Sequence, residues 1–325
     1  MFDLFIKIIN VIAPVFILIV IGAGFMHLKW LDNASNEKLK GLLYKFLMPV
    51  MLFYFMIKVD SEIIDFDFVV LLLVYTFVIF GLAVLLAHKF FAKNNKEVGI
   101  SSLIVTFSNS TYLGLPFCYL AFGVEGMAPA IITTTIYSLI FIAGSILLLQ
   151  IDEASKQQAN KLKLLGAVIL NTVKVPLVYA TFLGLVVSFI GISLPQFVST
   201  SLEMISNVNI GLALIVIGSS LYGVFSSEEP GIDKDFWLEI SYFNFYKLIL
   251  SPVVAFLIIA PFEFDIIWKS VFILQASLPV GLMSYVIASM NGVYDRRAGV
   301  AILSSTLLSI ITLTVILGLL FSWTV

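Results

Sequence analysis

The 325-residue sequence has few of the residues that catalytic and metal-binding sites commonly use. It contains one cysteine, two histidines and only 12% charged residues. A single cysteine cannot form a disulfide within the chain, and two histidines with one cysteine are too few for a zinc site. Lys and Arg number 18 against 20 Asp and Glu, so the chain has no excess of positive charge to bind a nucleic acid. These shortages argue against metal, redox and nucleic acid chemistry.

Recognisable enzyme motifs are also missing from the sequence. We find no Gly-rich phosphate loop, no nucleophile elbow and no pair of histidines within an apolar stretch. The sequence therefore shows no machinery for an ATP-driven pump or an intramembrane hydrolase. We expect that the protein is not an enzyme and that it has no cofactor and no metal.

Apolar residues are abundant. They make up 61% of the chain, which includes 29 Phe, and the mean hydropathy is +1.10. This apolar share is well above that of a soluble domain. A helix needs about 20 apolar residues to cross a bilayer. The sequence offers ten such stretches: residues 8–27, 38–57, 66–88, 99–121, 127–149, 166–190, 199–222, 237–260, 269–290 and 298–322. The pattern predicts an all-α polytopic membrane protein with ten transmembrane helices in contact with the lipid bilayer.

Basic residues in the loops predict the orientation of the chain. Lys7, Lys58 and Lys269 lie on one side of the ten stretches, and the larger group on the other side comprises Lys29, Lys38, Lys40, Lys89, Lys93, Lys96, Lys156, Lys161, Lys163, Lys234, Arg296 and Arg297. Short cytoplasmic loops are enriched in Lys and Arg. We therefore expect a multi-pass protein of the plasma or inner membrane with both termini outside the cytoplasm.

A polar linker at residues 151–165 divides the chain into residues 1–150 and 166–325, each with five of the ten stretches. Because five is odd, the second half must enter the membrane in the opposite direction, which is typical of an inverted repeat. The fourth stretch of each half contains Pro and Gly between polar residues, at Thr106–Pro116 and at Gln275–Gly281. Since proline disrupts a helix, we expect an interruption in both.

Proline and glycine are common in membrane helices, so one such break alone carries little information. Two breaks at matched positions in two halves are different, because they indicate the substrate site of a transporter. Interrupted helices place half-helix N-termini near the middle of the membrane, and these bind anions. The pattern favours an anionic substrate.

Several motifs carry a resemblance to a known family. They are Phe46-Leu47-Met48-Pro49, Ser108 to Pro116, Ser201 to Asn207 with Gly211, Lys247-Leu248-Ile249-Leu250-Ser251-Pro252, and Gln275 to Gly281 through Ala288. In these motifs, which run along nearly the whole chain, the sequence resembles the auxin efflux carrier family, whose members include plant auxin exporters and bacterial malonate or malate permeases.

The resemblance implies a fold like that of bile-acid symporters and sodium/proton antiporters. In that fold two inverted five-helix repeats form a scaffold part and a mobile part, helices 4 and 9 are broken and cross at the substrate site, and a homodimer is expected. By position, Asn109 matches the residue that contacts the substrate carboxylate, and Pro116 and Pro279 match the crossover prolines. The plant proteins' long central loop has no counterpart here.

The candidate substrate-binding residues lie in and around the two breaks: Ser108, Asn109, Thr111, Gly114, Gln275, Ser277 and Gly281. Asn109 can cap the second half-helix or donate its amide to a carboxylate. Ser108 and Thr111 can instead serve in helix packing. Gln275 can meet the substrate or bond only to exposed carbonyls.

Charge balance or ion coupling has four further candidates, Glu203, Asn207, Asn209 and Lys247. Glu203 can carry a proton or simply lie at a helix N-terminus. Lys247 can balance a carboxylate or attract an anion, with snorkelling to the cytoplasmic surface as the default. No Asp or Glu occurs at 101–122 or 271–290, which counts against cation antiport.

The sequence thus predicts a secondary transporter of a small organic anion, a mono- or dicarboxylate such as malate or malonate, that works by elevator-type alternating access. Two alternatives stay open. One is a symporter of another solute coupled to H+ or Na+, and the other is a membrane sensor that does not transport.

Overall fold

The computed structural model describes residues 2–59, 66–92, 94–156, 176–225 and 234–323, together with residues 166 and 170. Regular structure in these residues is helical, apart from one isolated β-bridge. Among the described residues, seven helices are long and apolar enough to cross a membrane. The prediction of an all-helical, polytopic membrane protein is confirmed.

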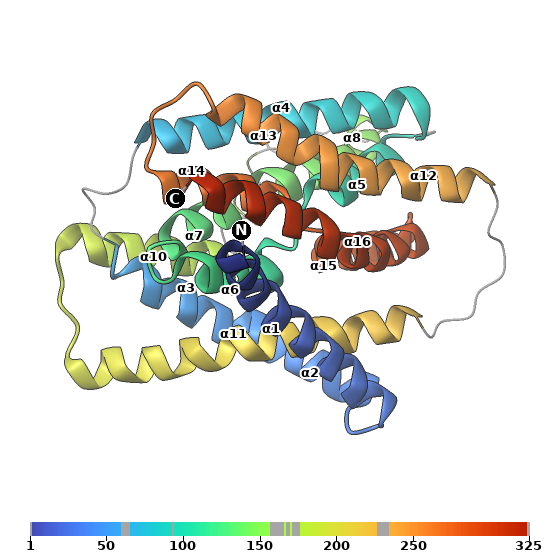
Figure 1. Ribbon diagram of the computed structural model, residues 1–325. Coiled ribbons are helices and arrows are strands. Elements are labelled where there is room, and N and C mark those ends of the chain that lie inside the picture. The colour runs from blue at the N-terminus through green and yellow to red at the C-terminus, as the bar shows by residue number, and fades with distance from the viewer. Residues whose placement is uncertain are drawn as a thin grey trace.

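A smaller group of helices lies in the lower part of Figure 1. It contains α1 (Phe2–His27), α2 (Asn33–Leu42), the π-helical turn η1 (Leu43–Leu47), α3 (Met48–Met56), α10 (Pro176–Ile190) and α11 (Gln196–Phe225). Within it α1 packs along α11, and α3 packs against α10 and α11. We call these helices the smaller group.

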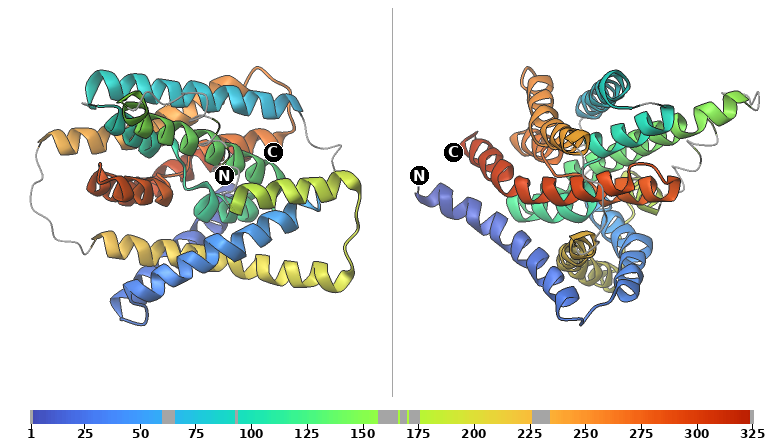
Figure 2. Two further views of the ribbon diagram at one scale, coloured as in Figure 1. Left: turned by 180° about the vertical axis from the view of Figure 1, so that it is seen from behind. Right: turned by 90° about the vertical axis from the view of Figure 1, so that its right-hand side faces the viewer.

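The remaining helices pack mainly against one another and form the larger group. Its members are α4 (Phe66–Phe90), α5 (Asn95–Thr106), η3 (Ser110–Gly114), α6 (Leu115–Phe122), α7 (Met127–Tyr137), η4 (Ser138–Ile142), α8 (Ala143–Lys156), α12 (Lys234–Phe245), η5 (Tyr246–Leu250), α13 (Ser251–Ile259), α14 (Ile266–Ala276), α15 (Leu282–Asn291) and α16 (Asp295–Trp323). Figure 2 shows α4 and α13 on the side of the molecule opposite α1 and α11.

Two glycines set how closely α1 and α11 approach. A Cβ atom on Gly22 would lie 1.9 Å from the backbone oxygen of Ile215, and one on Gly218 would lie 1.8 Å from the backbone oxygen of Ile19. No side chain fits at such distances. Small residues of this kind let membrane helices pack backbone to backbone. Such close contact strengthens van der Waals attraction, which drives helix association in lipid because no hydrophobic effect acts between helices there. The contact makes α1 and α11 a closely joined pair.

The π-helical turns share a feature with the following α-helical segments. Pro49, Pro116 and Pro252 each lie in the first turn of the segment that follows η1, η3 or η5. A proline has no N–H and crowds the turn before it, so an ordinary α-helix would lose a hydrogen bond there. A π turn changes the backbone pairing at that point. The helices therefore continue through these prolines.

The described part of the chain contains seven long apolar helices where the sequence suggested ten. Two of the other three stretches are divided, and the third is described only in part. Residues 99–121 and 269–290 are each divided into shorter helices by a non-helical segment. Residues 166–190 are described only at 166, 170 and 176–190, the last range being α10. The predicted linker at 151–165 begins within α8, and beyond Lys156 it lies outside the described residues, as do Lys93, Lys161 and Lys163 of the orientation argument.

Candidate functional site

The two interrupted helices meet at their non-helical segments. The helix of α5 ends at Thr106 and resumes at Ser110, and that of α14 ends at Ala276 and resumes at Leu282. Ser108 and Val280 form an antiparallel bridge. Beside it, the Asn109 N–H donates to the Pro279 carbonyl at 2.8 Å, and the Gly281 N–H donates to the Phe107 carbonyl at 2.8 Å. We call these two stretches, residues 107–109 and 279–281, together the paired segment. Their mutual hydrogen bonds satisfy backbone groups that the helices leave free.

The prolines predicted to break the helices occupy different places. Pro279 lies inside the non-helical segment, and its carbonyl takes part in the pairing. Pro116 lies in the first turn of α6, and the interruption comes earlier, at Phe107–Asn109. The π turn η3 carries the helix through Pro116. Pro116 therefore does not mark the site of the break itself.

Glycines allow the two segments to approach. A Cβ atom on Gly281 would lie 2.6 Å from the Phe107 ring and 2.8 Å from the Ser108 backbone oxygen. On Gly114 it would lie 2.5 Å from the Leu278 side chain and 2.7 Å from the Gln275 side-chain oxygen. Both glycines lie against the opposite interruption, so each allows the two interrupted helices to come into close contact.

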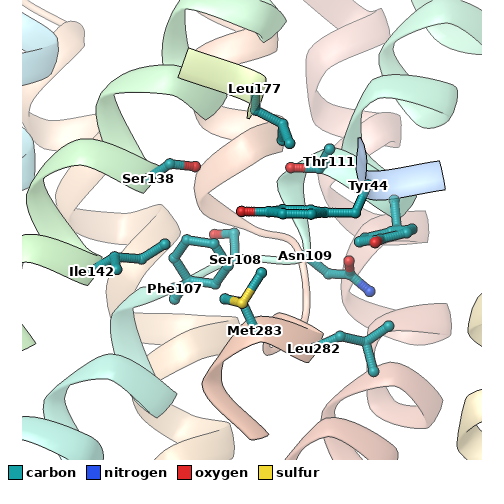
Figure 3. Close-up of a pocket in the computed structure, with 11 residues that line it drawn as sticks. Tyr44, Phe107, Ser108, Asn109, Thr111, Ser138, Ile142, Leu177, Leu282 and Met283 are labelled. Atoms are coloured by element: carbon teal, nitrogen blue, oxygen red, sulfur yellow. The ribbon is translucent and has the colours of Figure 1, made fainter. Parts of the chain in front are cut away.

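A small cavity lies against the paired segment. It is lined by Ser108, Asn109 and Thr111 from the first interruption, and the other lining residues are Tyr44, Phe107, Tyr112, Ser138, Ile142, Leu177, Leu282 and Met283. The Tyr44 ring reaches across the cavity towards the side of Ser138 and Phe107 (Figure 3). The cavity volume is about 30 Å³, which is room for one or two water molecules.

Asn109 has a free amide in this cavity. Its side chain is 2% exposed, makes no capping hydrogen bond to the helix that follows, and leaves the Nδ2 donor without a partner among the described residues. Figure 3 shows the amide pointing towards the side of Leu282. A buried donor without an acceptor is costly, and native proteins rarely keep one without a reason. The amide is therefore an available hydrogen-bond donor in the wall of the cavity.

Helix ends add positive potential at the same place. The helix that resumes at Ser110 has Asn109 as its N-cap, and α15 has Gly281 as its N-cap; neither receives a side-chain capping bond. The first residues of both helices, including Thr111 and Leu282, line the cavity. Helix N-termini present N–H groups and the positive end of the helix dipole. The cavity suits a negatively charged group.

Lys247 lies on the other side of Ser108. Its side chain is 1% exposed, so the expected snorkelling to the surface is wrong. The Nζ atom donates to Ser108 Oγ at 2.5 Å, to the Ala276 carbonyl at 3.3 Å and to the Thr106 carbonyl at 3.4 Å. The side chain reaches inwards because η5 packs against α5, and from there the Nζ atom also meets the last carbonyl of α14.

Gln275 and Ser277 do not line the cavity. Gln275 is fully buried, its Nε2 lies 3.7 Å from Cys118 Sγ, and its Oε1 has no partner among the described residues. The Ser277 hydroxyl donates to the Ile273 carbonyl of its own helix at 2.6 Å. The structure therefore brings Gln275 next to the first interruption and leaves Ser277 occupied within α14.

The remaining coupling candidates lie on α11 in the smaller group. Glu203 and Asn207 are exposed, whereas Asn209 is buried. Asn209 donates from Nδ2 to Met51 Sδ at 3.0 Å, and its Oδ1 has no partner among the described residues. None of the three lines the cavity. The structure thus separates them from Ser108, Asn109 and Lys247.

A second, larger cavity lies near the opposite ends of several of these helices. Its volume is about 460 Å³, and Phe55, Lys58 and Val59 of the smaller group line it together with Val124, Glu125, Met127, Ala128, Asp265, Ile267 and Trp268 of the larger group. Both cavities therefore lie where the two groups meet.

Sequence reasoning missed most of the cavity wall. Tyr44 lies two residues before a quoted motif, and Ser138 is one of several hydroxyl-bearing residues in an apolar stretch, so each gave only a weak signal. Phe107, Ile142, Leu177, Leu282 and Met283 look like any apolar residue of a membrane helix. Within the described residues, no group of three or more His, Cys, Asp or Glu side chains could hold a metal ion.

Comparisons with known proteins find one family model and several proteins named as transporters. The model of a family described as "Membrane transport protein" matches residues 7–317. The chain is 23% identical to "Uncharacterized transporter YfdV" of Escherichia coli K12, over 93% of this chain and 94% of that protein. It is 24% identical to "Putative malonate transporter" of Rhizobium meliloti over 97% of both chains. It is 22% identical to "Uncharacterized transporter MJ1031" of Methanocaldococcus jannaschii over 94% of this chain and 96% of that protein.

Proposed function

Because the chain belongs to the membrane transport protein family, that of the auxin efflux carriers, we propose that this multi-pass transporter, which is not an enzyme, carries a small organic anion. The substrate class is a mono- or dicarboxylate such as malonate or malate. A relative's printed name supports malonate as the first substrate to test.

The free amide of Asn109 is the observation that carries this proposal. A carboxylate in the cavity would accept a hydrogen bond from Nδ2 and would lie near the two uncapped helix N-termini. Charge-assisted hydrogen bonds of this kind are stronger than neutral ones. The site would then hold an anion by dipoles and an amide, with no cationic side chain in the cavity lining.

The proposed transport cycle moves the larger group against the smaller group. The cavity beside Asn109 has room for one or two water molecules, so a carboxylate requires its walls to separate. Tyr44 and Leu177 belong to one group and the other lining residues to the other group. The second cavity also lies between the groups, as expected if they part alternately at the two ends. This is elevator-type alternating access in a ten-span, inverted-repeat carrier, with the paired segment as its crossover.

Counterflow in proteoliposomes tests the substrate class. Vesicles loaded with unlabelled malonate should accumulate labelled malonate from outside, and an external panel of mono-, di- and tricarboxylates should compete according to fit. Empty liposomes and a neutral analogue, malonamide, are the controls. Absence of counterflow for every carboxylate, or equal competition by malonamide, would contradict an anion carrier.

Cross-linking tests the movement between the two groups. The test pair is Val59→Cys with Ala128→Cys, two positions that line the larger cavity from opposite groups. The control pair is Ala128→Cys with Ile267→Cys, which line it from the same group. In a Cys118→Ala background, a short bismaleimide should stop counterflow in the first pair and leave it in the second. Continued counterflow in a fully cross-linked Val59/Ala128 pair would rule out relative movement at this cavity.

A further inference from the structure

Lys247 is a buried basic side chain whose three hydrogen-bond partners are all uncharged. An ammonium has three N–H donors, and here one hydroxyl and two backbone carbonyls accept them. Burial of a charge in a membrane protein is expensive, and such residues are kept at functional places. Three acceptors around Nζ match the three N–H donors of an ammonium, and none of the three carries a negative charge.

The two carbonyls come from matching places in the fold. Thr106 is the last residue of α5 and Ala276 is the last residue of α14, so each carbonyl belongs to the C-terminus of a half-helix. C-terminal carbonyls lack helical partners and form the negative end of the dipole. The Ser251 hydroxyl also donates to the Ala276 carbonyl at 3.0 Å, which brings a further oxygen close by.

A set of this kind is what a small monovalent cation binds in interrupted-helix carriers, where half-helix C-termini and unwound carbonyls supply the ligands. Here the N-termini face the cavity with Asn109, and the C-termini face Lys247. The two sides of the paired segment therefore have opposite potentials, and the side that attracts cations already contains one.

We propose that the Lys247 ammonium is a tethered substitute for a bound monovalent cation at the paired segment, so that the wild-type carrier works without Na+. The part concerning transport rests on the proposed function; the cation site does not. Lys247 acts here as a positioning residue, because it holds the two C-termini and Ser108 and does not line the cavity. Removal of the side chain should leave a vacant site that a free cation can enter.

Two variants separate the charge from the space. Lys247→Ala removes both the ammonium and its stem, so a small cation can enter. Lys247→Met removes the charge but keeps a stem of similar length, which blocks entry. The first readout is thermal unfolding of the purified protein in NaCl, KCl, ethylammonium chloride or N-methylglucamine chloride at one ionic strength, and it does not depend on transport.

For the wild type we expect the same unfolding midpoint in all four salts. Lys247→Ala should have a lower midpoint in N-methylglucamine and should gain several degrees with Na+ or ethylammonium. The gain should rise with the logarithm of ligand concentration once the site is mostly occupied, as binding linkage requires. Lys247→Met should show no such gain. An equal response of the two variants, or no response of Lys247→Ala to any small cation, would overturn the proposal. Failure of Lys247→Ala to fold in every salt, while Lys247→Met folds, would overturn it too.

Counterflow supplies the second readout. Wild-type counterflow should be equal in Na+ and N-methylglucamine, and Lys247→Ala should lose most of its activity and recover part of it with ethylammonium or Na+. A requirement of the wild type for Na+ would overturn the proposal. Cation-specific stabilisation of Lys247→Ala in a protein that transports no carboxylate would instead keep the cation site and reject the proposed substrate.

Discussion

The two interrupted helices have similar residues, but the structure uses their side chains differently. At the first interruption Ser108 contacts Lys247, and Asn109 directs an unpartnered amide into the cavity. At the second, Ser277 bonds to its own helix and Gln275 packs against Gly114, outside the cavity lining. The first interruption therefore places polar side chains at the cavity and at Lys247, whereas the second contributes backbone pairing and close packing.

The difference shows what a matched pair of breaks provides. The backbone pairing is reciprocal, since each segment donates one N–H to the other. The side chains do not need to be equivalent. One segment can fix the backbone geometry while the other provides the polar side chains. Substitutions in the two interruptions should therefore have unequal effects on transport.

The largest effect is expected at Gly281. In Gly281→Ala the new Cβ meets the Ser108 backbone oxygen at 2.8 Å, and overpacking of this kind costs ~1–3 kcal/mol of stability. We expect a lower unfolding midpoint and loss of malonate counterflow. Gly114→Ala should be milder, because its closest contacts are the ends of the Leu278 and Gln275 side chains. Gly81→Ala, whose Cβ would meet nothing within 4 Å, is the control. Equal midpoints for the variants at Gly281 and Gly81 would refute the close-contact role.

The next effect is expected at Asn109. Asn109→Ala should fold normally and reduce counterflow about tenfold or more, because a hydrogen bond to a charged group contributes ~1.5–3 kcal/mol. The unfolding midpoint should stay or rise, since a buried donor without a partner is removed. Normal counterflow in this variant would remove Asn109 from the site. A lower midpoint with weak counterflow would point to a structural role.

A smaller effect is expected at Gln275. Its Oε1 has no partner among the described residues and its Nε2 meets only the Cys118 sulfur, so Gln275→Leu should keep or raise the unfolding midpoint. We expect the counterflow rate to change by less than about threefold. That is smaller than the tenfold change to which ~1.4 kcal/mol corresponds. A loss as large as that of Asn109→Ala would make the two interruptions equivalent.

The smallest effect is expected at Ser277. Ser277→Ala removes a hydroxyl that bonds to the Ile273 carbonyl of the same helix, a carbonyl that also accepts the Ser277 N–H. The change should be within about 0.5 kcal/mol of stability and leave counterflow unaltered. Competition curves for carboxylates should overlay those of the wild type, and a shifted curve would place Ser277 at the ligand.

The class of the fold could be predicted because hydropathy and helix length are local properties of the sequence. The position of Lys247 could not, since the sequence alone does not say whether a lysine stem reaches the surface or the centre. That depends on the neighbouring ends of α5 and α14, which are far away in the chain. Tyr44 was missed for a similar reason: its place in the cavity follows from how the two groups meet.

Proline gave a correct indication at Pro279 and a misleading one at Pro116. Both signal a conflict with an α-helix, but a conflict can be resolved by unwinding or by a π turn. Pro279 lies in the non-helical segment between α14 and α15, whereas at Pro116 the turn η3 keeps the chain helical. Sequence spacing alone does not distinguish these outcomes.

The π turns also affect how this chain is to be aligned with its relatives. A π turn holds one residue more than an α turn, so it shifts the helical phase of everything after it by about 100°. Tyr44, Thr111, Ser138 and Lys247 each lie on such a turn. A relative with one residue fewer at any of these turns would present a different side chain to the site, even with both flanking motifs intact. Gaps of a single residue inside these helices are therefore the places where alignments should be examined for changes in substrate.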